Sequence, residues 1–214
     1  MDTQWPQDIA PDLARRSQNR RAQYGSHLQL QIGQRREETE AFIARVFRKA
    51  HAARITGFLP VLLAMRDPHG RLISACGLRS ASGASLFLEQ YLDCAIEQAI
   101  TTALGVRVPR SAIVEIGNLA VASRGSAREL IVALTRFLVP TPFQWVVFTA
   151  LPNLRNAFTR LRIPITDLGE ARLDCLPPSV RLDWGNYYDA GPRVNAVSVD
   201  DSCTALDALK RRPG

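Results

Sequence analysis

An acidic residue inside an apolar run is the first feature of the sequence that suggests chemistry. Glu115 stands between Val114 and Ile116 in a β-branched stretch that is typical of a buried central strand. Because burial disfavours a charged carboxylate, such an acid is either paired or has a raised pKa. A raised pKa suits a general base. The alternative is a structural salt bridge to an arginine of the same sheet.

A second acidic segment lies upstream, where Glu89, Tyr91 and Asp93 alternate with other residues. In an extended segment these side chains would point to one face, either together into a substrate cleft or together into solvent. We favour the cleft, with Glu89 and Asp93 as catalytic candidates and Tyr91 as a substrate-binding candidate. Glu97 falls in an expected helix and is interpreted as a solvated surface charge.

A strand, a small-residue turn and a helix follow one another from residue 112 to residue 139. This order favours an anion, because the first N–H groups of a helix are free and its dipole is positive at that end. Small residues would let a pyrophosphate or a phosphopantetheine approach the backbone. The alternative is an ordinary βα connection. The candidate phosphate-binding residues are Arg124, Gly125, Ser126 and Ala127.

The elements that position these residues follow from hydrophobic periodicity. Strands are expected at 28–32, 58–66, 72–80, 112–121, 143–150 and 194–199, and helices at 37–54, 96–104, 127–139 and 153–161. Asp67-Pro68-His69-Gly70 predicts a hairpin turn. The segment Trp184–Tyr188 is expected to add a further strand. An early hairpin followed by βα units predicts a mixed α/β (α+β) sheet with helices on both faces.

Composition limits the class of protein. The 214 residues, 46% hydrophobic and 22% charged, suit one globular domain. We expect a basic, flexible segment at 1–23, a single domain at 24–199 and a frayed tail at 200–214. The sequence shows neither a signal peptide nor an apolar run of spanning length, which predicts a cytoplasmic protein without integral membrane association.

Charge and metal-binding residue types limit the partners. The net charge of +7 favours an acidic partner such as an acyl carrier protein. Aromatic residues are not interleaved with the basic ones, so no nucleic acid is expected. The four cysteines and three histidines are dispersed, which predicts no metal site.

The strand–turn–helix unit resembles the donor-binding unit of GNAT acyltransferases, in which an Arg/Gln-x-x-Gly-x-Gly/Ala loop binds acyl-CoA. Gly125 and Ala127 occupy the last two motif positions, whereas Ala122 stands at the first. The resemblance implies that backbone N–H groups around Leu119 to Val121 polarise the thioester carbonyl. It also places Phe158 where many of these enzymes have a tyrosine that protonates the leaving thiolate. Tyr187 or Tyr188 would then take that role, unless the thiolate leaves unassisted.

Longer strings resemble the thermostable hemolysin family, which is GNAT-like. They are Phe87–Asp93 (FLEQYLD), Val114–Ala120 (VEIGNLA), Trp145–Ala150 (WVVFTA), Leu154–Asn156 and Trp184–Tyr188. The resemblance runs from about residue 24 to 197. The strand at 115–121 is also similar to one in acyl-homoserine-lactone synthases, with Gly117-Asn118 where those enzymes have Ser-Arg.

These resemblances imply an N-acyltransferase that moves an acyl group from acyl-CoA or an acyl carrier protein to an amine or amino acid. No permanently bound cofactor is implied, and the acyl thioester is a co-substrate. Asn118 would bind substrate or be a bulge residue, and Arg155 with Asn156 would bind an acceptor carboxylate. Two alternatives stay open, namely a hemolysin that acts on membranes directly and a non-catalytic module that binds an acyl carrier or a partner.

Overall fold

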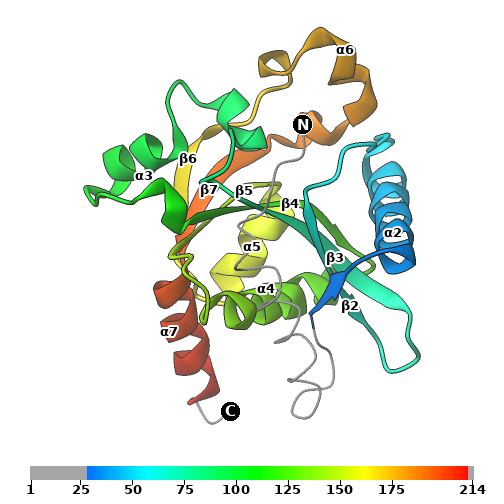
Figure 1. Ribbon diagram of the computed structural model, residues 1–214, viewed down its shortest axis with the longest axis horizontal. Helices are drawn as coiled ribbons and strands as arrows, with labels where there is room; N and C mark the ends of the chain where they lie inside the picture. The colour runs from blue at the N-terminus through cyan, green and yellow to red at the C-terminus, as the bar shows by residue number, and fades with distance from the viewer. Residues whose placement is uncertain (1–27, 212–214) are drawn as a thin grey trace.

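A seven-stranded sheet forms the centre of the molecule (Figure 1). The computed structural model describes residues 28–211, except for the side chain of Arg124. The spatial order of the strands is β1-β2-β3-β4-β5-β7-β6, and all neighbours are antiparallel except β4 and β5. The strands are β1 (Gln29–Gln31), β2 (Val61–Arg66), β3 (Leu72–Ser80), β4 (Ile113–Val121), β5 (Trp145–Ala150), β6 (Thr166–Glu170) and β7 (Arg193–Ser198).

Helices α4 (Arg124–Leu138), α5 (Pro152–Arg160) and α7 (Val199–Lys210) cover one face of the sheet. Alternate strand residues such as Val114, Ile116 and Phe148 point to this face and share one hydrophobic cluster with Leu130 of α4 and Leu206 of α7. Helix α4 follows β4 directly, so that its N-terminus lies at the end of that strand. We call this side the α4 face.

The opposite side, called here the α2 face, carries two smaller clusters. Helix α2 (Gln34–His51) packs Phe42 and Ile43 against β2, β3 and β4. The 3₁₀ turn η1 (Phe87–Tyr91) and helix α3 (Ile96–Leu104) pack against β4, β5 and β7. A short helix α6 (Pro178–Arg181) and two 3₁₀ turns, η4 (Leu182–Trp184) and η5 (Tyr187–Ala190), precede β7.

The predicted fold class is confirmed, since helices cover both faces of a mixed, mostly antiparallel sheet. The predicted hairpin is confirmed as well: Asp67 Oδ1 accepts the N–H groups of His69 and Arg71, and Gly70 has a φ of 80°. The early strands and helices lie within a few residues of their expected bounds.

Two expectations are wrong, and a third cannot be compared with the structure. The segment Trp184–Tyr188 forms 3₁₀ turns rather than a strand, and the sheet gains β6 instead. The tail expected to fray after residue 200 is helix α7, which packs Leu206 into the core and is capped by Ser198 Oγ at 3.1 Å from the N–H of Asp201. The basic segment expected at 1–23 lies outside the described residues.

Candidate functional site

Strands β4 and β5 separate in the middle of the sheet. Their parallel pairing runs only from Ile113 opposite Trp145 to Ile116 opposite Phe148. Beyond that point β4 stays paired with β3, and β5 stays paired with β7. The two strands therefore bound a wedge that begins directly after Glu115 and Ile116.

A bulge marks the start of this wedge. The register between β3 and β4 shifts at Asn118, whose φ is 49°. Asn118 Oδ1 accepts the N–H of Leu59 at 2.8 Å, and its Nδ2 donates to the carbonyl of Gly57 at 3.1 Å. The amide therefore fastens the segment before β2 across the α2 face. Of the two roles considered for Asn118, the structure shows that of a bulge residue. Its amide still has one N–H and one lone pair for other partners.

Two glycines make room for the fastened segment. A Cβ on Gly77 would lie 2.7 Å from Leu59 Cβ, and a Cβ on Gly117 would lie 3.0 Å from Leu59 Cδ1. These glycines are opposite each other in the register of β3 and β4. Leu59 therefore lies on the sheet itself and forms one wall of the region around Glu115.

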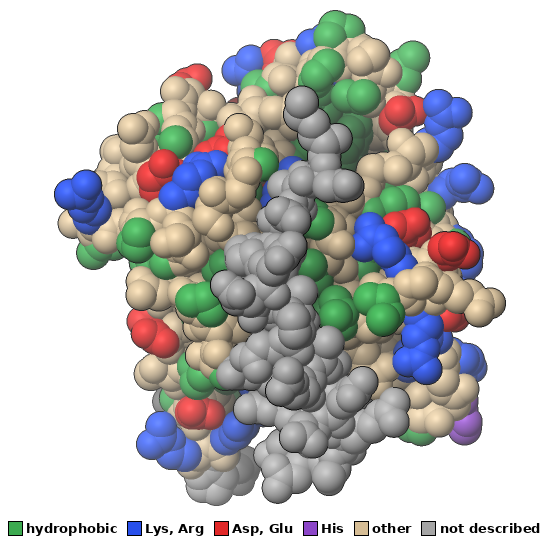
Figure 2. Space-filling model, viewed as in Figure 1, with side chains coloured by type: hydrophobic (Ala, Val, Ile, Leu, Met, Phe, Trp, Pro, Cys, Tyr) green, Lys and Arg blue, Asp and Glu red, His purple; other side chains and the backbone are tan. Residues whose placement is uncertain are grey.

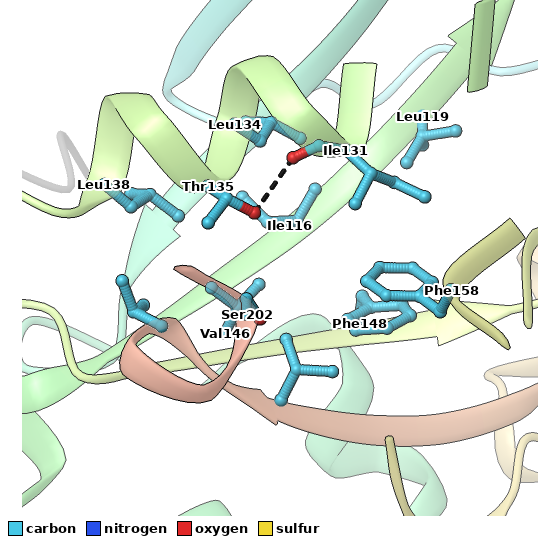
Figure 3. Close-up of a pocket in the computed structure, with 12 residues that line it drawn as sticks. Ile116, Leu119, Ile131, Leu134, Thr135, Leu138, Val146, Phe148, Phe158 and Ser202 are labelled. Atoms are coloured by element: carbon cyan, nitrogen blue, oxygen red, sulfur yellow. Dashed lines mark hydrogen bonds between the residues drawn. The ribbon is translucent and has the colours of Figure 1, made fainter. Parts of the chain in front are cut away.

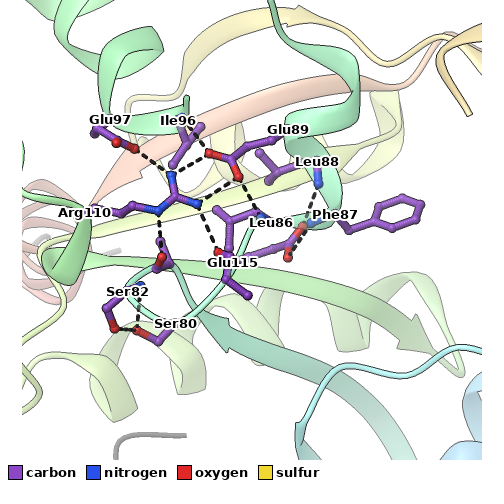
Figure 4. Close-up of polar contacts among 12 residues, drawn as sticks. Ser80, Ser82, Leu86, Phe87, Leu88, Glu89, Ile96, Glu97, Arg110 and Glu115 are labelled. Atoms are coloured by element: carbon purple, nitrogen blue, oxygen red, sulfur yellow. Dashed lines mark hydrogen bonds and ion pairs between the residues drawn. The ribbon is translucent and has the colours of Figure 1, made fainter. Parts of the chain in front are cut away.

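Glu115 is buried on the α2 face, with 4% of its surface exposed. Its carboxylate accepts the N–H groups of Phe87 at 3.1 Å and Leu88 at 2.9 Å, which anchors the start of η1 (Figure 4). Burial raises the pKa of Glu115, and the two hydrogen bonds and the charge of Arg79 oppose this shift only in part. The direction is the one expected from the sequence. The alternative, a salt bridge to an arginine, is not seen, because backbone N–H groups hold the carboxylate.

Glu89 belongs to a different arrangement, an ion network around Arg110 (Figure 4). Arg110 Nη1 lies 2.6 Å from Glu89 Oε1 and 2.7 Å from Glu97 Oε2, while Glu89 also accepts the N–H groups of Leu86 and Ile96. Burial alone would raise the pKa of Glu89, but Arg110 and the backbone donors outweigh it and lower the pKa to about 2. Such a weak base suits an anchor better than a proton acceptor.

The alternation expected for residues 89–93 is wrong, because η1 is a 3₁₀ turn and not an extended segment. Asp93 is exposed, whereas Glu115 is buried. Glu97 is not the solvated charge that was expected, since it pairs with Arg110. Arg110 itself carried no signal in the sequence, because a lone arginine before a strand fits many roles.

An aromatic cluster covers η1 on the α2 face. Tyr91 and Tyr188 share a hydrogen bond of 2.5 Å between their hydroxyls. Trp184 joins the cluster with its ring centroid 5.8 Å from that of Phe87 and 5.4 Å from that of Tyr187. Burial raises the pKa of Tyr188 to about 12 and raises the pKa values of Tyr91 and Tyr187 as well. All three phenols therefore stay protonated at neutral pH.

Tyr187 is the most buried of these tyrosines and packs against the end of α2. Its ring centroid lies 6.1 Å from that of Phe47 and 5.2 Å from that of His51. Burial lowers the pKa of His51. The negative charge of Glu115 contributes to the raised pKa of Tyr91, so the aromatic cluster and Glu115 share one region.

The expected phosphate site is at the N-terminus of α4, which begins at Arg124, earlier than predicted. Ser123 and Ser126 bring their hydroxyls within 3.0 Å of each other, and nothing lies within 4 Å of a Cβ built on exposed Gly125. Ala127 is half-buried in the first turn. The side chain of Arg124 lies outside the described part of the chain.

A narrow apolar cavity of about 40 Å³ lies behind the wedge on the α4 face (Figure 3). Leu119 and Ile116 of β4 line it from one side, and Ile131 of α4 lies opposite. Phe158, which stands where a catalytic tyrosine was considered, lines the cavity and stacks on Phe148 with ring centroids 4.9 Å apart. Val121 is half-buried nearby at the end of β4.

Arg155 and Asn156 lie on α5, on the other side of the sheet from Glu115. Arg155 Nη2 lies 3.3 Å from Asp167 Oδ2 of β6, and Asn156 is exposed. The structure therefore does not bring these two residues to the buried acid. Within residues 28–211, no group of three or more His, Cys, Asp or Glu side chains is placed to hold a metal ion.

The wedge, the bulge and the helix that follows β4 define a GNAT-like fold, and known structures share it. FeeM, an N-acyl amino acid synthase from uncultured soil microbes, is 13% identical, with a TM-score of 0.59 over 87% of this chain and 97% of its own. LasI, an AHL synthase, is 14% identical, with a TM-score of 0.55 over 86% and 96%. BjaI, a CoA-dependent acyl-homoserine lactone synthase solved with SAM and isopentyl-CoA, is 11% identical, with a TM-score of 0.55 over 88% and 92%.

The chain belongs to the thermostable hemolysin family, whose model matches residues 30–203. The family resemblance of the sequence is thereby confirmed. No curated protein matches the chain in sequence. Among the described helices, none is long and apolar enough to cross a membrane.

Proposed function

We propose that this protein is an N-acyltransferase that moves an acyl group from a thioester to an amine or amino acid. The observation that carries the proposal is the buried Glu115 at the point where β4 and β5 separate. It supplies a proton acceptor on the α2 face beside an opening in the sheet, while the N-terminus of α4 supplies an anion site on the other side. The proposal is supported by the fold shared with FeeM, an N-acyl amino acid synthase, and with the acyl-homoserine lactone synthases LasI and BjaI.

In the proposed reaction, the lone pair of the neutral amine attacks the thioester carbonyl carbon. A C–N bond forms, the C–S bond breaks, and the sulfur leaves with its bonding pair. Glu115 takes one proton from the nitrogen, and a proton is delivered to the leaving sulfur, so that the products are an amide and a thiol. Its two backbone hydrogen bonds leave Glu115 with about two further acceptor positions for this purpose.

The donor is proposed to lie along the end of β4. Beyond Ile116 the backbone groups of β4 that point away from β3 have no partner on β5, so N–H groups between Leu119 and Val121 can bind the thioester oxygen. The phosphates would bind at the first turn of α4, around Gly125, Ser126 and Ala127. The acyl chain would enter the apolar cavity that Leu119 lines.

Acyl-CoA and an acyl carrier protein are both proposed as donors for this site. In Figure 2, basic side chains are interspersed with acidic ones over the described part of the visible face, so the net positive charge forms no single large patch there. The preference for an acidic carrier therefore stays a prediction from net charge. Neither donor would be a permanently bound cofactor.

The proton for the leaving sulfur is proposed to come from Tyr187 or from solvent. Phe158 has no proton to donate and lies in the core. The raised pKa of Tyr187 keeps its phenol protonated, although its ring packs against α2. A thiolate with a solution pKa near ~8.5 can also leave unassisted. Asn118 and Tyr91 line the same region and are proposed to contact the acceptor.

One observation favours the alternative of a non-catalytic binding module: both oxygens of Glu115 already hold η1. The test is thiol release from a panel of acyl-CoAs and acyl carrier proteins, with amines and amino acids as acceptors. We expect acceptor-dependent release that falls about 10²–10⁴-fold in Glu115→Gln, the range for a lost general base. Exposed Glu37 provides a matched control, Glu37→Gln, with unchanged rates.

Two outcomes would contradict the proposal, the first by refuting the enzyme and the second by refuting the role of Glu115. The first is the absence of release across the whole panel, together with no thermal stabilisation by CoA. The second is full activity in Glu115→Gln, which would leave an acyltransferase without this base. Lysis of red cells by the purified protein without any acyl donor would instead favour direct action on membranes.

A further inference from the structure

An arginine on the α2 face is partly buried, yet it has no polar partner among residues 28–211. Arg79 lies on β3 directly opposite Glu115 on β4 in the register of the sheet. Its Nε is buried without a hydrogen-bond partner, and no ion pair or hydrogen bond joins its guanidinium to any described residue. The carboxylate of Glu115 binds Phe87 and Leu88 instead. A buried donor without a partner is costly, so its presence needs an explanation, and a ligand that binds it would supply one.

The surroundings of Arg79 and Glu115 confine them to one site. On one side, Leu59 covers Gly77 and Gly117, the next residues of β3 and β4 on the same face of the sheet. On the other side lies Phe87, whose N–H is bound by Glu115. The helix N-terminus proposed for the donor phosphates lies on the α4 face, across the sheet. The free guanidinium is therefore on the side of the amine acceptor, and the donor phosphates are not its ligand.

We infer that Arg79 binds the carboxylate of an α-amino acid whose amino group lies at Glu115, so that the acceptor is a free amino acid and not a simple amine. Directly opposite residues of an antiparallel pair have Cα atoms about 4.5–5.5 Å apart. Their side chains can therefore grip the two neighbouring polar groups of one amino acid. A guanidinium binds a carboxylate with two parallel hydrogen bonds, which a simple amine cannot make. The inference rests on the proposed function and names its acceptor class.

Arg155, the residue expected from the sequence to bind this carboxylate, is already paired with Asp167 on the other side of the sheet. Arg110 is likewise engaged, with Glu89 and Glu97. Of Arg79, Arg110 and Arg155, only Arg79 lies beside Glu115 and has a guanidinium that no described residue binds.

The test compares acceptors that differ only in the carboxylate. Each of the twenty common L-amino acids is assayed with an acyl-CoA panel, and each substrate is compared with the amine that lacks its carboxylate. We expect wild type to prefer the amino acid. In Arg79→Gln the KM for the amino acid should rise about 10- to 100-fold, the loss expected for a charge-assisted pair, while the KM for the amine changes much less, because the amine has no carboxylate for Arg79 to bind. The KM of Arg79→Lys for the amino acid should lie between those of wild type and Arg79→Gln, because lysine keeps the positive charge but cannot make the two parallel hydrogen bonds of a guanidinium.

A second measurement does not depend on turnover: calorimetric binding of the same amino acids to the free protein. Wild type should bind and Arg79→Gln should not, whereas Arg71→Gln, on an exposed arginine of the hairpin, should bind like wild type. Circular dichroism checks that each variant is folded. The inference is overturned if transfer favours the bare amine, if Arg79→Gln binds normally, or if no amino acid binds. If amino acids bind only when Arg79 is present but no acyl transfer occurs, the proposed reaction is refuted and the amino-acid site is supported.

Discussion

Replacing Glu89 by glutamine removes the negative partner of Arg110 and keeps the size of the side chain. Glu89 accepts hydrogen bonds from Arg110, from the N–H of Leu86 at 2.7 Å and from the N–H of Ile96 at 2.9 Å. The variant keeps one acceptor oxygen and turns an amide N–H toward donors. We therefore expect a loss of stability and a looser connection between β3 and α3.

The size of the loss follows from the pKa of Glu89, which the fold lowers from an ordinary value near 4.5 to about 2. A shift of this size corresponds to at most about 3.4 kcal/mol at neutral pH. The side chain of Arg110 is 27% exposed, so solvent screens the pair and we expect about 1–2 kcal/mol. For a chain of this length the melting temperature should fall by about 2–8 °C.

The pH dependence of this loss separates the ion network from simple packing. Because the folded pKa is below the unfolded one, the stabilisation is fully present above pH 4.5 and is lost as the pH falls toward 2. Urea unfolding of wild type and Glu89→Gln at pH 7, 5, 4 and 3 measures the difference between the two free energies. By pH 3 the contribution of the ionised Glu89 carboxylate to this free-energy difference should have fallen to about half of its value at pH 7.

The exposed carboxylate of Glu170 provides the control, since 66% of its side chain is accessible and Glu170→Gln should change stability by less than ~0.5 kcal/mol. A difference between wild type and Glu89→Gln that stays constant from pH 7 to pH 3 would refute the ionic anchor. A variant as stable as wild type would show that the network contributes nothing. Either result would reopen a catalytic role for Glu89.

Three further changes test the wedge. Gly77→Ala places a Cβ 2.7 Å from Leu59 Cβ, and thermal melts should show a loss of about 1–3 kcal/mol that Leu59→Ala partly relieves. Asn118→Ala loses two hydrogen bonds and puts alanine at a φ of 49°, so it should lower the free energy of unfolding by about 2–4 kcal/mol. Asn118→Gly should melt at a higher temperature than Asn118→Ala, because glycine adopts a positive φ without strain. Leu119→Trp narrows the cavity, and acyl-CoA assays should show a preference shifted to shorter chains. An unchanged chain-length profile would place the acyl group elsewhere.

The sequence could predict the elements whose local signals agree with their tertiary setting. The apolar run around Glu115 predicted the buried central strand, and the Pro68–Gly70 turn predicted the hairpin. The raised pKa of Glu115 followed from the same run, because burial is its main cause. The backbone donors that hold its carboxylate come from residues 27 and 28 positions away and have no local signature.

Other elements were missed for physical reasons. Strand β6 is a polar, half-exposed edge strand with a bulge at Gly169, so it lacks an alternating pattern. The sequence contains a signal for α7, since Ser198 precedes Asp201 by three residues as in a capped helix, but Ser198 also falls within the strand expected at 194–199. Trp184 and Tyr187 have the composition of a strand, and tertiary packing against α2 makes them 3₁₀ turns.

Arg79 shows most clearly why a site is harder to predict than a fold. In the sequence it is one of 27 basic residues, 36 positions before Glu115, and nothing local distinguishes it from an arginine on the surface. The register of β3 against β4 places it opposite the buried acid, and that register depends on the bulge at Asn118. The same bulge fastens Leu59 beside the pair and marks the start of the wedge. One asparagine therefore couples the shape of the opening to the wall of the proposed acceptor site, which is why its loss should impair both stability and transfer.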